Sequence, residues 1–187
     1  MSIEETARKI EELEIQGATR IAIEAVNALQ EYADEGASDR ELEQAAEKLL
    51  DTRPTEPALQ NAVASVLEER NFEQVLDHFQ DAKHAIADEG ASLLQDGSIV
   101  YTHCHSSTVA AVLRHAKTQT DFTVRNTETR PVYQGRTTAE ELATHGIEVE
   151  HYVDAAAKIA LENADIMLIG ADAITWQGDV YNKVGSG

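Results

Sequence analysis

Apolar residues recur at helical spacing through the first half of the chain. The pattern is carried by Ile10, Leu13, Ile21, Ala25 and Leu29, and Gly17 interrupts it. Two capping boxes predict the starts of helices, one formed by Ser2 with Glu5 and the other by Ser38 with Glu41. We therefore expect an N-terminal domain made of helices alone over residues 1–90.

Helix-breaking residues divide this first half into segments. Gly36 breaks the chain, and the segment from Arg53 to Pro57 stops the helix that follows. Pro57 also suits the first turn of the next helix, where its missing N–H is not needed. Asn71, three residues before Gln74, can cap a further long helix.

Strand and helix patterns alternate in the second half, over residues 91–187. We expect strands at residues 98–103, 122–127, 147–153 and 166–170. Helices are expected at residues 108–115, 137–145 and 155–164, the second capped by Thr137 and Glu140 and the third by Asp154. This alternation predicts an α/β fold in which a parallel, Rossmann-like sheet follows the helical domain. Residues 182–187 resemble a glycine-rich loop, so we expect a sheet domain that lacks its C-terminal part, the front of a longer protein.

Acidic residues dominate the chain's charge. The net charge is −19, from 34 acidic and 15 basic residues, and such a surface repels nucleic acid and anionic membranes. We expect a protein of a halophilic archaeal cytoplasm, where molar salt screens the repulsion; an ordinary acidic mesophilic protein is the alternative. The single cysteine fits a reducing cytosol. We see neither a signal peptide nor an apolar stretch long enough to span a membrane.

Four polar clusters follow the predicted strands. They are Thr102–Ser107, Glu128–Pro131, Asp154 and Gly170–Ala173. Ligands of parallel sheets bind beyond the C-terminal ends of the strands. We therefore expect the four clusters to converge on one edge of the sheet.

Two residues of these clusters can transfer protons. Cys104 lies between a strand and a helix, and the positive end of the helix dipole favours its thiolate. Asp172 follows the most apolar strand, which we expect to be buried, and a carboxyl group at the end of a buried strand suits a proton shuttle. The alternatives are that Cys104 is a small packing residue and that Asp172 caps a loop.

Other residues near this edge could bind an anion. Ser106, Ser107 and Thr108 open a helix, where backbone amides and hydroxyl groups suit phosphate. Arg130 could bind phosphate through its forked guanidinium, and Lys183 could do so as a point charge. The alternatives are ordinary helix capping and solvated surface side chains.

The two histidines that flank Cys104 suggest, together with its thiol, a metal site. In an extended segment, however, His103 and His105 point to the same side and Cys104 points away. This geometry argues against three ligands on one ion. We therefore predict neither a metal nor a cofactor.

Six short motifs, in order, carry a family resemblance over nearly the whole chain. They are Gln16-Gly17-Ala18, Arg53-Pro54-Thr55, Thr102-His103-Cys104, Glu128-Thr129-Arg130-Pro131 with Gln134-Gly135-Arg136, Gly170-Ala171-Asp172, and Asn182-Lys183-Val184-Gly185. Together they resemble the superfamily of ribose 1,5-bisphosphate isomerase, methylthioribose 1-phosphate isomerase and the regulatory subunits of translation initiation factor 2B. Within it, the cysteine and the aspartate are typical of the isomerases.

The resemblance implies an aldose–ketose isomerase that converts ribose 1,5-bisphosphate to ribulose 1,5-bisphosphate through a cis-phosphoenolate. Cys104 would take the proton from carbon 2, and Asp172 would move a proton between oxygens. Implied substrate contacts are Gln16, Gly17, Ala18, Thr19, Arg53, Ser106, Ser107, Thr108, Asn182 and Lys183, with Arg130 at the same edge. Isomerases of the family usually carry an arginine where Gln16 stands, so one phosphate contact loses its charge.

The resemblance also implies a place in AMP and nucleoside breakdown. A homo-oligomer, a dimer or a hexamer, would be the working form, and AMP is a candidate activator. Two other functions stay open: a non-catalytic regulatory subunit like those of initiation factor 2B, and an isomerase of methylthioribose 1-phosphate.

Overall fold

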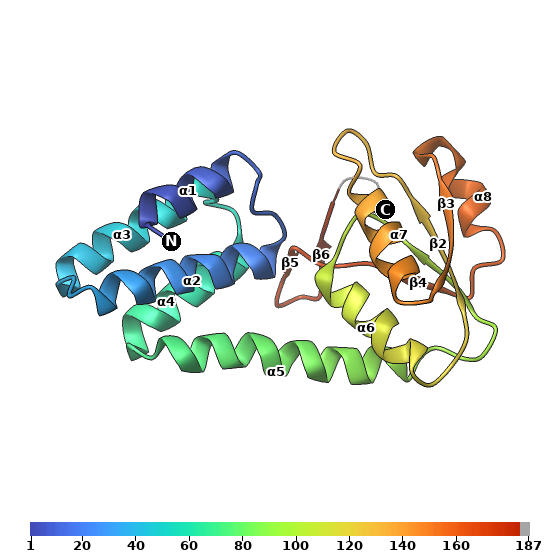
Figure 1. The fold of residues 1–187 in the computed structure, drawn as a ribbon, viewed down its shortest axis with the longest axis horizontal. Helices are drawn as coiled ribbons and strands as arrows, with labels where there is room; N and C mark the ends of the chain where they lie inside the picture. Colours follow the sequence, from blue (N-terminus) through green and yellow to red (C-terminus); the bar gives the residue numbers. More distant parts are fainter. Residues whose placement is uncertain (184–187) are drawn as a thin grey trace. The chain divides into compact units, whose positions relative to one another are not determined.

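The computed structural model describes residues 1–183 and divides them into two compact units (Figure 1). Unit 1 comprises Met1–Asp81 and Asp172–Tyr181, and unit 2 comprises Ala82–Ala171 with Asn182 and Lys183. The segment from Val184 to Gly187, which ends the predicted glycine-rich loop, lies outside the described residues. The domain boundary at residue 90 stays a prediction.

Unit 1 is built mainly from helices. They are α1 (Ile3–Glu11), α2 (Ala18–Asp34), α3 (Asp39–Thr52), α4 (Pro57–Glu69) and the first part of α5 (Phe72–Ala91). Helix α2 packs against α1, α3 and α4, and the fully buried side chains include Ile10, Leu29, Leu49 and Leu59. No helix formed by residues 1–183 has the length and apolar character that crossing a membrane requires.

The predicted caps of these helices are confirmed. The Ser2 hydroxyl accepts a hydrogen bond from the Glu5 backbone N–H at 3.2 Å. Ser38 and Glu41 form the full capping box, in which each side chain bonds the other's backbone. Pro57 occupies the first turn of α4. The local pattern therefore fixes the starts of these helices.

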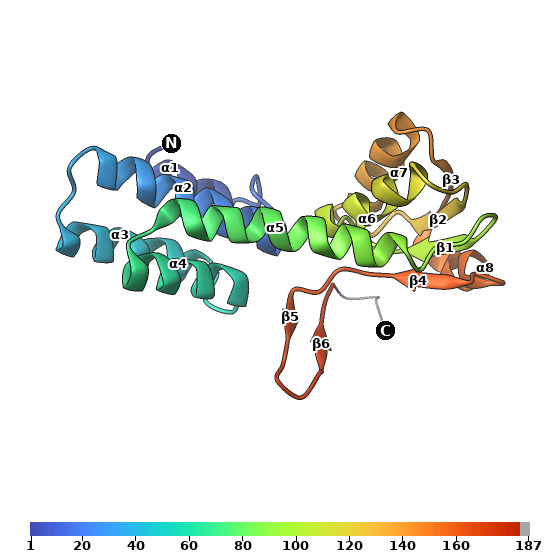
Figure 2. The same ribbon diagram turned by 90° about the horizontal axis from the view of Figure 1, so that it is seen from below.

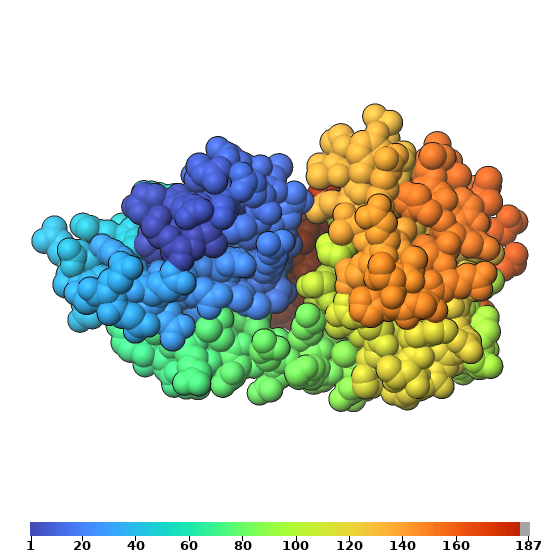
Figure 3. Space-filling view, in the orientation of Figure 1, coloured from blue at the N-terminus to red at the C-terminus, as the bar shows by residue number. Residues whose placement is uncertain are grey.

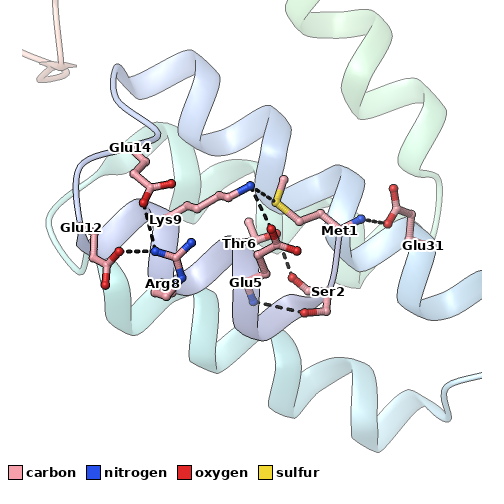
Figure 4. A network of polar contacts seen from close by, with 9 residues as sticks. All are labelled: Met1, Ser2, Glu5, Thr6, Arg8, Lys9, Glu12, Glu14 and Glu31. Atoms are coloured by element: carbon pink, nitrogen blue, oxygen red, sulfur yellow. Dashed lines mark hydrogen bonds and ion pairs between the residues drawn. The ribbon is translucent and has the colours of Figure 1, made fainter.

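Ion pairs lie at both ends of α1 (Figure 4). Arg8 binds Glu12 and Glu14, the latter at 3.0 Å, and the N-terminal ammonium of Met1 binds Glu31. These groups are largely exposed, and exposed pairs contribute little to stability. The apolar core, rather than this network, holds unit 1 together.

Unit 2 contains a parallel four-stranded sheet in the order β3-β2-β1-β4. Its elements are β1 (Ile99–Thr102), α6 (Ser107–Lys117), β2 (Thr123–Thr127), α7 (Gln134–Thr144), β3 (Glu148–Tyr152), the 3-10 turn η1 (Asp154–Ala156), α8 (Ala157–Leu161) and β4 (Ile166–Leu168). Helices α6 and α7 lie on one face of the sheet (Figure 2) and form a continuous outer surface there (Figure 3). The predicted fold class, helices followed by a Rossmann-like parallel sheet, is confirmed.

The core of unit 2 follows from strand register. Val100, Val124 and Val149 stand side by side on neighbouring strands. Leu113 from α6 and Leu142 from α7 pack onto this row. Parallel sheets bury apolar side chains under their crossover helices in this way.

Helix α7 starts three residues earlier than the sequence predicts, so the predicted cap at Thr137 is wrong. Tyr133, at a φ of 59°, precedes the helix and provides no side-chain cap. A Cβ atom at Gly135 would lie 1.7 Å from the carbonyl oxygen of Thr127. Glycine thus lets the first turn of α7 press against the end of β2, and this packing outweighs the capping pattern.

The predicted third helix, at residues 155–164, is also wrong in its length and its cap. The chain forms the turn η1 and then α8, which ends at Leu161. The Asp154 side chain does not cap this segment, because its two oxygens accept hydrogen bonds from the backbone of Thr129 and Arg130.

Two features near the chain's end also differ from the predictions. The fourth strand, which its apolar sequence predicts as buried, forms an edge of the sheet within the described residues, and Met167 is 42% exposed. The hairpin of β5 (Ala173–Ile174) and β6 (Val180–Tyr181) in unit 1 was not predicted. Strands of two residues are too short to show an alternating pattern.

We expect Gly135→Ala to destabilise the chain by at least about 2 kcal/mol, because the new Cβ must displace backbone. Thr137→Ala, an exposed change in the same helix, should stay within about 0.5 kcal/mol. Urea unfolding measures both. A loss of about 1 kcal/mol in Thr137→Ala would instead support Thr137 as the helix cap.

Candidate functional site

Cys104 follows β1 in a backbone conformation that is uncommon for residues other than glycine. Its φ is 67°, in the left-handed region. Its N–H donates to the Thr129 hydroxyl at 2.9 Å, and its carbonyl accepts from the Thr138 hydroxyl at 2.8 Å. The end of β2 and helix α7 therefore hold this residue from both sides, and a strained conformation held in this way is common at functional sites.

The sulfur of Cys104 is half-buried and contacts the side chain of Gln134. Its Sγ donates to Gln134 Oε1 at 3.2 Å. Gln134 is the first residue of α7, so the early start of this helix brings its amide to the thiol. Gln134 was not predicted as a site residue, although the motif Gln134-Gly135-Arg136 had singled it out.

The two histidines beside Cys104 bind threonine hydroxyls. His103 Nδ1 lies 3.0 Å from Thr127 Oγ1, and His105 Nδ1 lies 3.0 Å from Thr138 Oγ1. The extended geometry assumed for this segment is wrong at Cys104, because its φ is positive. Within residues 1–183, no three His, Cys, Asp or Glu side chains are grouped to hold a metal ion.

Asp154 anchors the loop that follows β2. Its oxygens accept the backbone N–H groups of Thr129 at 2.8 Å and Arg130 at 2.7 Å. Burial alone would raise the pKa of Asp154, but these two hydrogen bonds, with help from Thr127 and His103, hold it below its usual value. An ionised Asp154 therefore fixes Thr129, and Thr129 in turn binds Cys104.

Two arginines give this edge of unit 2 positive charge. The Arg130 guanidinium lies 5.3 Å from the ring centroid of Tyr133, and that of Arg136 lies 4.1 Å from it. Arg136 also pairs with Glu128 at 3.0 Å. Arg130 is exposed, so its side chain is accessible to an anion.

The start of α6 completes this edge. The Ser106 hydroxyl caps α6 by accepting the Val109 N–H at 3.3 Å, as in ordinary helix capping. Ser107 is exposed and Thr108 is half-buried in the first turn. A Cβ atom at Gly170 would lie 2.9 Å from the Ser106 hydroxyl, so the chain beyond β4 meets α6 here. Unit 2 thus gathers residues of all four predicted clusters at one edge of its sheet.

The remaining predicted residues of the N-terminal segment lie in unit 1. Gly17 has a φ of 88° and precedes α2, which begins with Ala18 and Thr19. The Gln16 amide donates to the Leu13 carbonyl at 2.5 Å. Arg53 ends α3 and donates to the Ile10 carbonyl at 3.2 Å, which joins the ends of α1 and α3.

Asp172 precedes β5 in unit 1, whereas Cys104 belongs to unit 2. The Asp172 side chain is exposed, and its backbone N–H donates to the Tyr181 carbonyl at 2.8 Å. Its charge acts on Glu56, a residue that was not predicted, together with the charge of Arg53. Asn182 and Lys183 are half-buried directly after β6.

A separate hollow of about 740 Å³ lies between α4 and α5 in unit 1. Its lining includes Ala62, Ser65, Val75, His78 and Phe79. None of the predicted site residues lines it, so it plays no part in the candidate site.

A protein-family model described as the Initiation factor 2 subunit family matches residues 14–187. The chain belongs to this family. The family resemblance inferred from the six motifs is thereby confirmed.

Relatives of the chain carry two kinds of name. The chain is 37% identical to the ribose 1,5-bisphosphate isomerase of Thermococcus kodakarensis, over an aligned region that covers 97% of this chain and 65% of that protein. It is also 37% identical to the Haloterrigena turkmenica protein of the same name, covering 97% and 62%. The structure of Pyrococcus horikoshii translation initiation factor eIF-2B matches with a TM-score of 0.89 at 32% identity, covering 98% and 71%.

We expect Asp154→Asn to lose about 1 kcal/mol of unfolding free energy at pH 7, because a neutral amide accepts the two N–H groups less well. Because the pKa of Asp154 is lower in the folded protein than in the unfolded chain, its ionised form stabilises the fold at pH values above the pKa of the unfolded chain, about 3.9. The loss should therefore shrink as the pH falls below about 4. Denaturant unfolding at several pH values measures it, and a pH-independent loss would contradict an ionic role.

Proposed function

We propose that this family member forms the catalytic part of a ribose 1,5-bisphosphate isomerase, an intramolecular aldose–ketose isomerase. The 37% identity to two proteins of that name carries the proposal. The backbone around Cys104 supports it, because a thiol held in a fixed, half-buried position suits proton abstraction. The chain spans 62–65% of the length of these relatives, so the proposal concerns the part that the chain represents.

In the proposed reaction, one proton moves between carbons and one between oxygens. Cys104 takes the proton from carbon 2 as the ring bond from carbon 1 to its oxygen breaks, which leaves a cis-phosphoenolate. The proton then reaches carbon 1. Asp172 carries the proton of the 2-hydroxyl group to the former ring oxygen. The atoms balance with no oxidant or reductant, and the product is ribulose 1,5-bisphosphate.

Cationic and helix-terminal groups would bind the two phosphates. In unit 2 these are Arg130 and the first turn of α6, with Ser106, Ser107 and Thr108. Unit 2 would also contribute Asn182 and Lys183. In unit 1 the phosphate-binding groups would be Arg53 and the start of α2, with Gln16, Gly17, Ala18 and Thr19. A dianion near so acidic a chain needs such local positive charge, because the net charge is −19.

The cellular setting is part of the proposal. We place the enzyme in the cytoplasm of a halophilic archaeon, in AMP and nucleoside breakdown, as a homodimer or hexamer that AMP activates. The net charge of −19 supports the first part, because dense surface carboxylates require salt to screen their repulsion.

A second candidate is a regulatory subunit of the initiation factor 2B type. The similarity to the Pyrococcus horikoshii protein favours it. A regulatory subunit would bind a nucleotide or sugar phosphate without turning it over. The presence of both Cys104 and Asp172 favours the isomerase.

We expect purified protein, expressed as the longest polypeptide that its gene encodes, to convert ribose 1,5-bisphosphate to ribulose 1,5-bisphosphate. Cys104→Ser and Asp172→Asn should each lower kcat at least about 100-fold, the usual contribution of an acid or base. Asp179→Asn removes a carboxylate from the same hairpin and serves as the matched control. Absence of turnover in the wild type, with tight binding of the sugar bisphosphate, would favour the regulatory subunit.

Salt should stabilise the chain strongly. We expect the Tm to rise by at least about 4 °C between 0.2 and 2 M KCl, which corresponds to roughly 1 kcal/mol or more. Combining Glu43→Gln, Glu47→Gln and Glu68→Gln, all at exposed positions, should reduce this rise. Calorimetry measures both proteins, and an unchanged Tm in 2 M KCl would contradict the halophilic origin.

A further inference from the structure

Glu56 occupies the turn between α3 and α4. Its backbone N–H donates to the Arg53 carbonyl at 3.1 Å, and its carbonyl accepts the Gln60 N–H at 3.1 Å. It stands at the cap position of α4, yet its side chain makes no capping hydrogen bond. The backbone therefore fixes Glu56 beside Arg53 and leaves its carboxyl group for another role.

The carboxyl group of Glu56 differs from the other buried polar side chains among residues 1–183. Its Oε1 is buried without a hydrogen-bond partner, and no other buried side-chain oxygen or nitrogen in the described part of the chain shares this condition. Leaving a buried carboxylate oxygen unpaired is costly. Such an atom in a folded protein calls for an explanation in terms of strain, function or an absent ligand.

Two charged groups act on Glu56, and all three residues belong to unit 1. Burial is the largest influence and raises the pKa of Glu56. The negative charge of Asp172 raises it further, and the positive charge of Arg53 opposes both. The carboxylate of Glu56 therefore competes with any bound anion for the positive charge of Arg53. The negative charge of Asp172, to which the proposed function gives a proton-transfer role, acts on the same carboxylate.

We propose that Glu56 is a positioning residue that takes up a proton when an oxyanion such as a phosphate group binds at Arg53. The unprotonated carboxylate neutralises part of the Arg53 charge in the empty protein. An incoming dianion adds negative charge to Glu56 and Asp172, and Glu56 is the group that becomes neutral. The protonated side chain leaves Arg53 to the ligand and gains an O–H that can donate a hydrogen bond. This inference rests on the proposed function only in taking Arg53 as a phosphate ligand.

Sulfate is the sharpest probe, because it stays a dianion above about pH 3 and so any proton taken up must enter the protein. Calorimetry of sulfate binding between pH 5 and 7, in two buffers with different ionisation enthalpies, measures that uptake. We expect uptake of a measurable fraction of a proton in the wild type and none in Glu56→Gln. Glu68→Gln removes the same charge from the exposed far end of α4 and should keep the wild-type uptake.

Affinity gives a second measurement. Removing the competing charge should make Glu56→Gln bind sulfate about two- to fivefold more tightly at pH 7, the effect of one charge a few ångströms away in water. The advantage should vanish at low pH, where Glu56 of the wild type is already protonated. Carbon-13 NMR of the wild type tests the same point without a variant, because sulfate should move the Glu56 titration to higher pH.

The outcomes separate this inference from the proposed function. Undetectable sulfate binding, or equal uptake in the wild type and Glu56→Gln, would overturn the role of Glu56. Loss of sulfate binding in Arg53→Gln is expected, and unchanged binding there would also overturn it. If proton uptake follows Glu56 but no isomerase turnover is found, the inference stands and the proposed function falls.

Discussion

The hydrogen bond from the Cys104 backbone to the Thr129 hydroxyl is the constraint on which the edge of unit 2 depends. Thr129 itself has a φ of 59°, so neither residue would adopt its conformation without support. The support comes from Asp154, whose carboxylate binds the N–H of Thr129. Three successive strand ends are thereby linked, and the position of the one thiol depends on a carboxylate fifty residues away in the chain.

Local signals in the sequence predicted most of the elements. Ser2, Ser38 and Asn71 cap helices as predicted, because a cap needs only residues a few positions apart. The parallel sheet also followed from the alternation of apolar strands and helices. The start of α7 did not, because it depends on contact between Gly135 and the backbone of Thr127. Asp154 failed as a cap for the same reason, since distant amides outcompete the nearby ones.

The candidate site was also predicted only in part. The sequence singled out Cys104 and the clusters around it, since strand ends in parallel sheets are reliable places to look. It missed the groups that position the thiol, Thr138 and Gln134, because their role is visible only once α7 packs on β2 and β3 and reaches the residue that follows β1. It also missed Glu56, since nothing within a few residues reveals that one of its oxygens is buried and unpaired.

The close approach at Gly135 has a consequence for sequence divergence within the family. Any related chain that carries a side chain at this position must begin the helix elsewhere or move it away from the strand. Gln134 occupies the neighbouring position, so that shift would withdraw its amide from the sulfur. Loss of this glycine should therefore mark branches in which the cysteine has acquired a different environment, even where the cysteine itself persists.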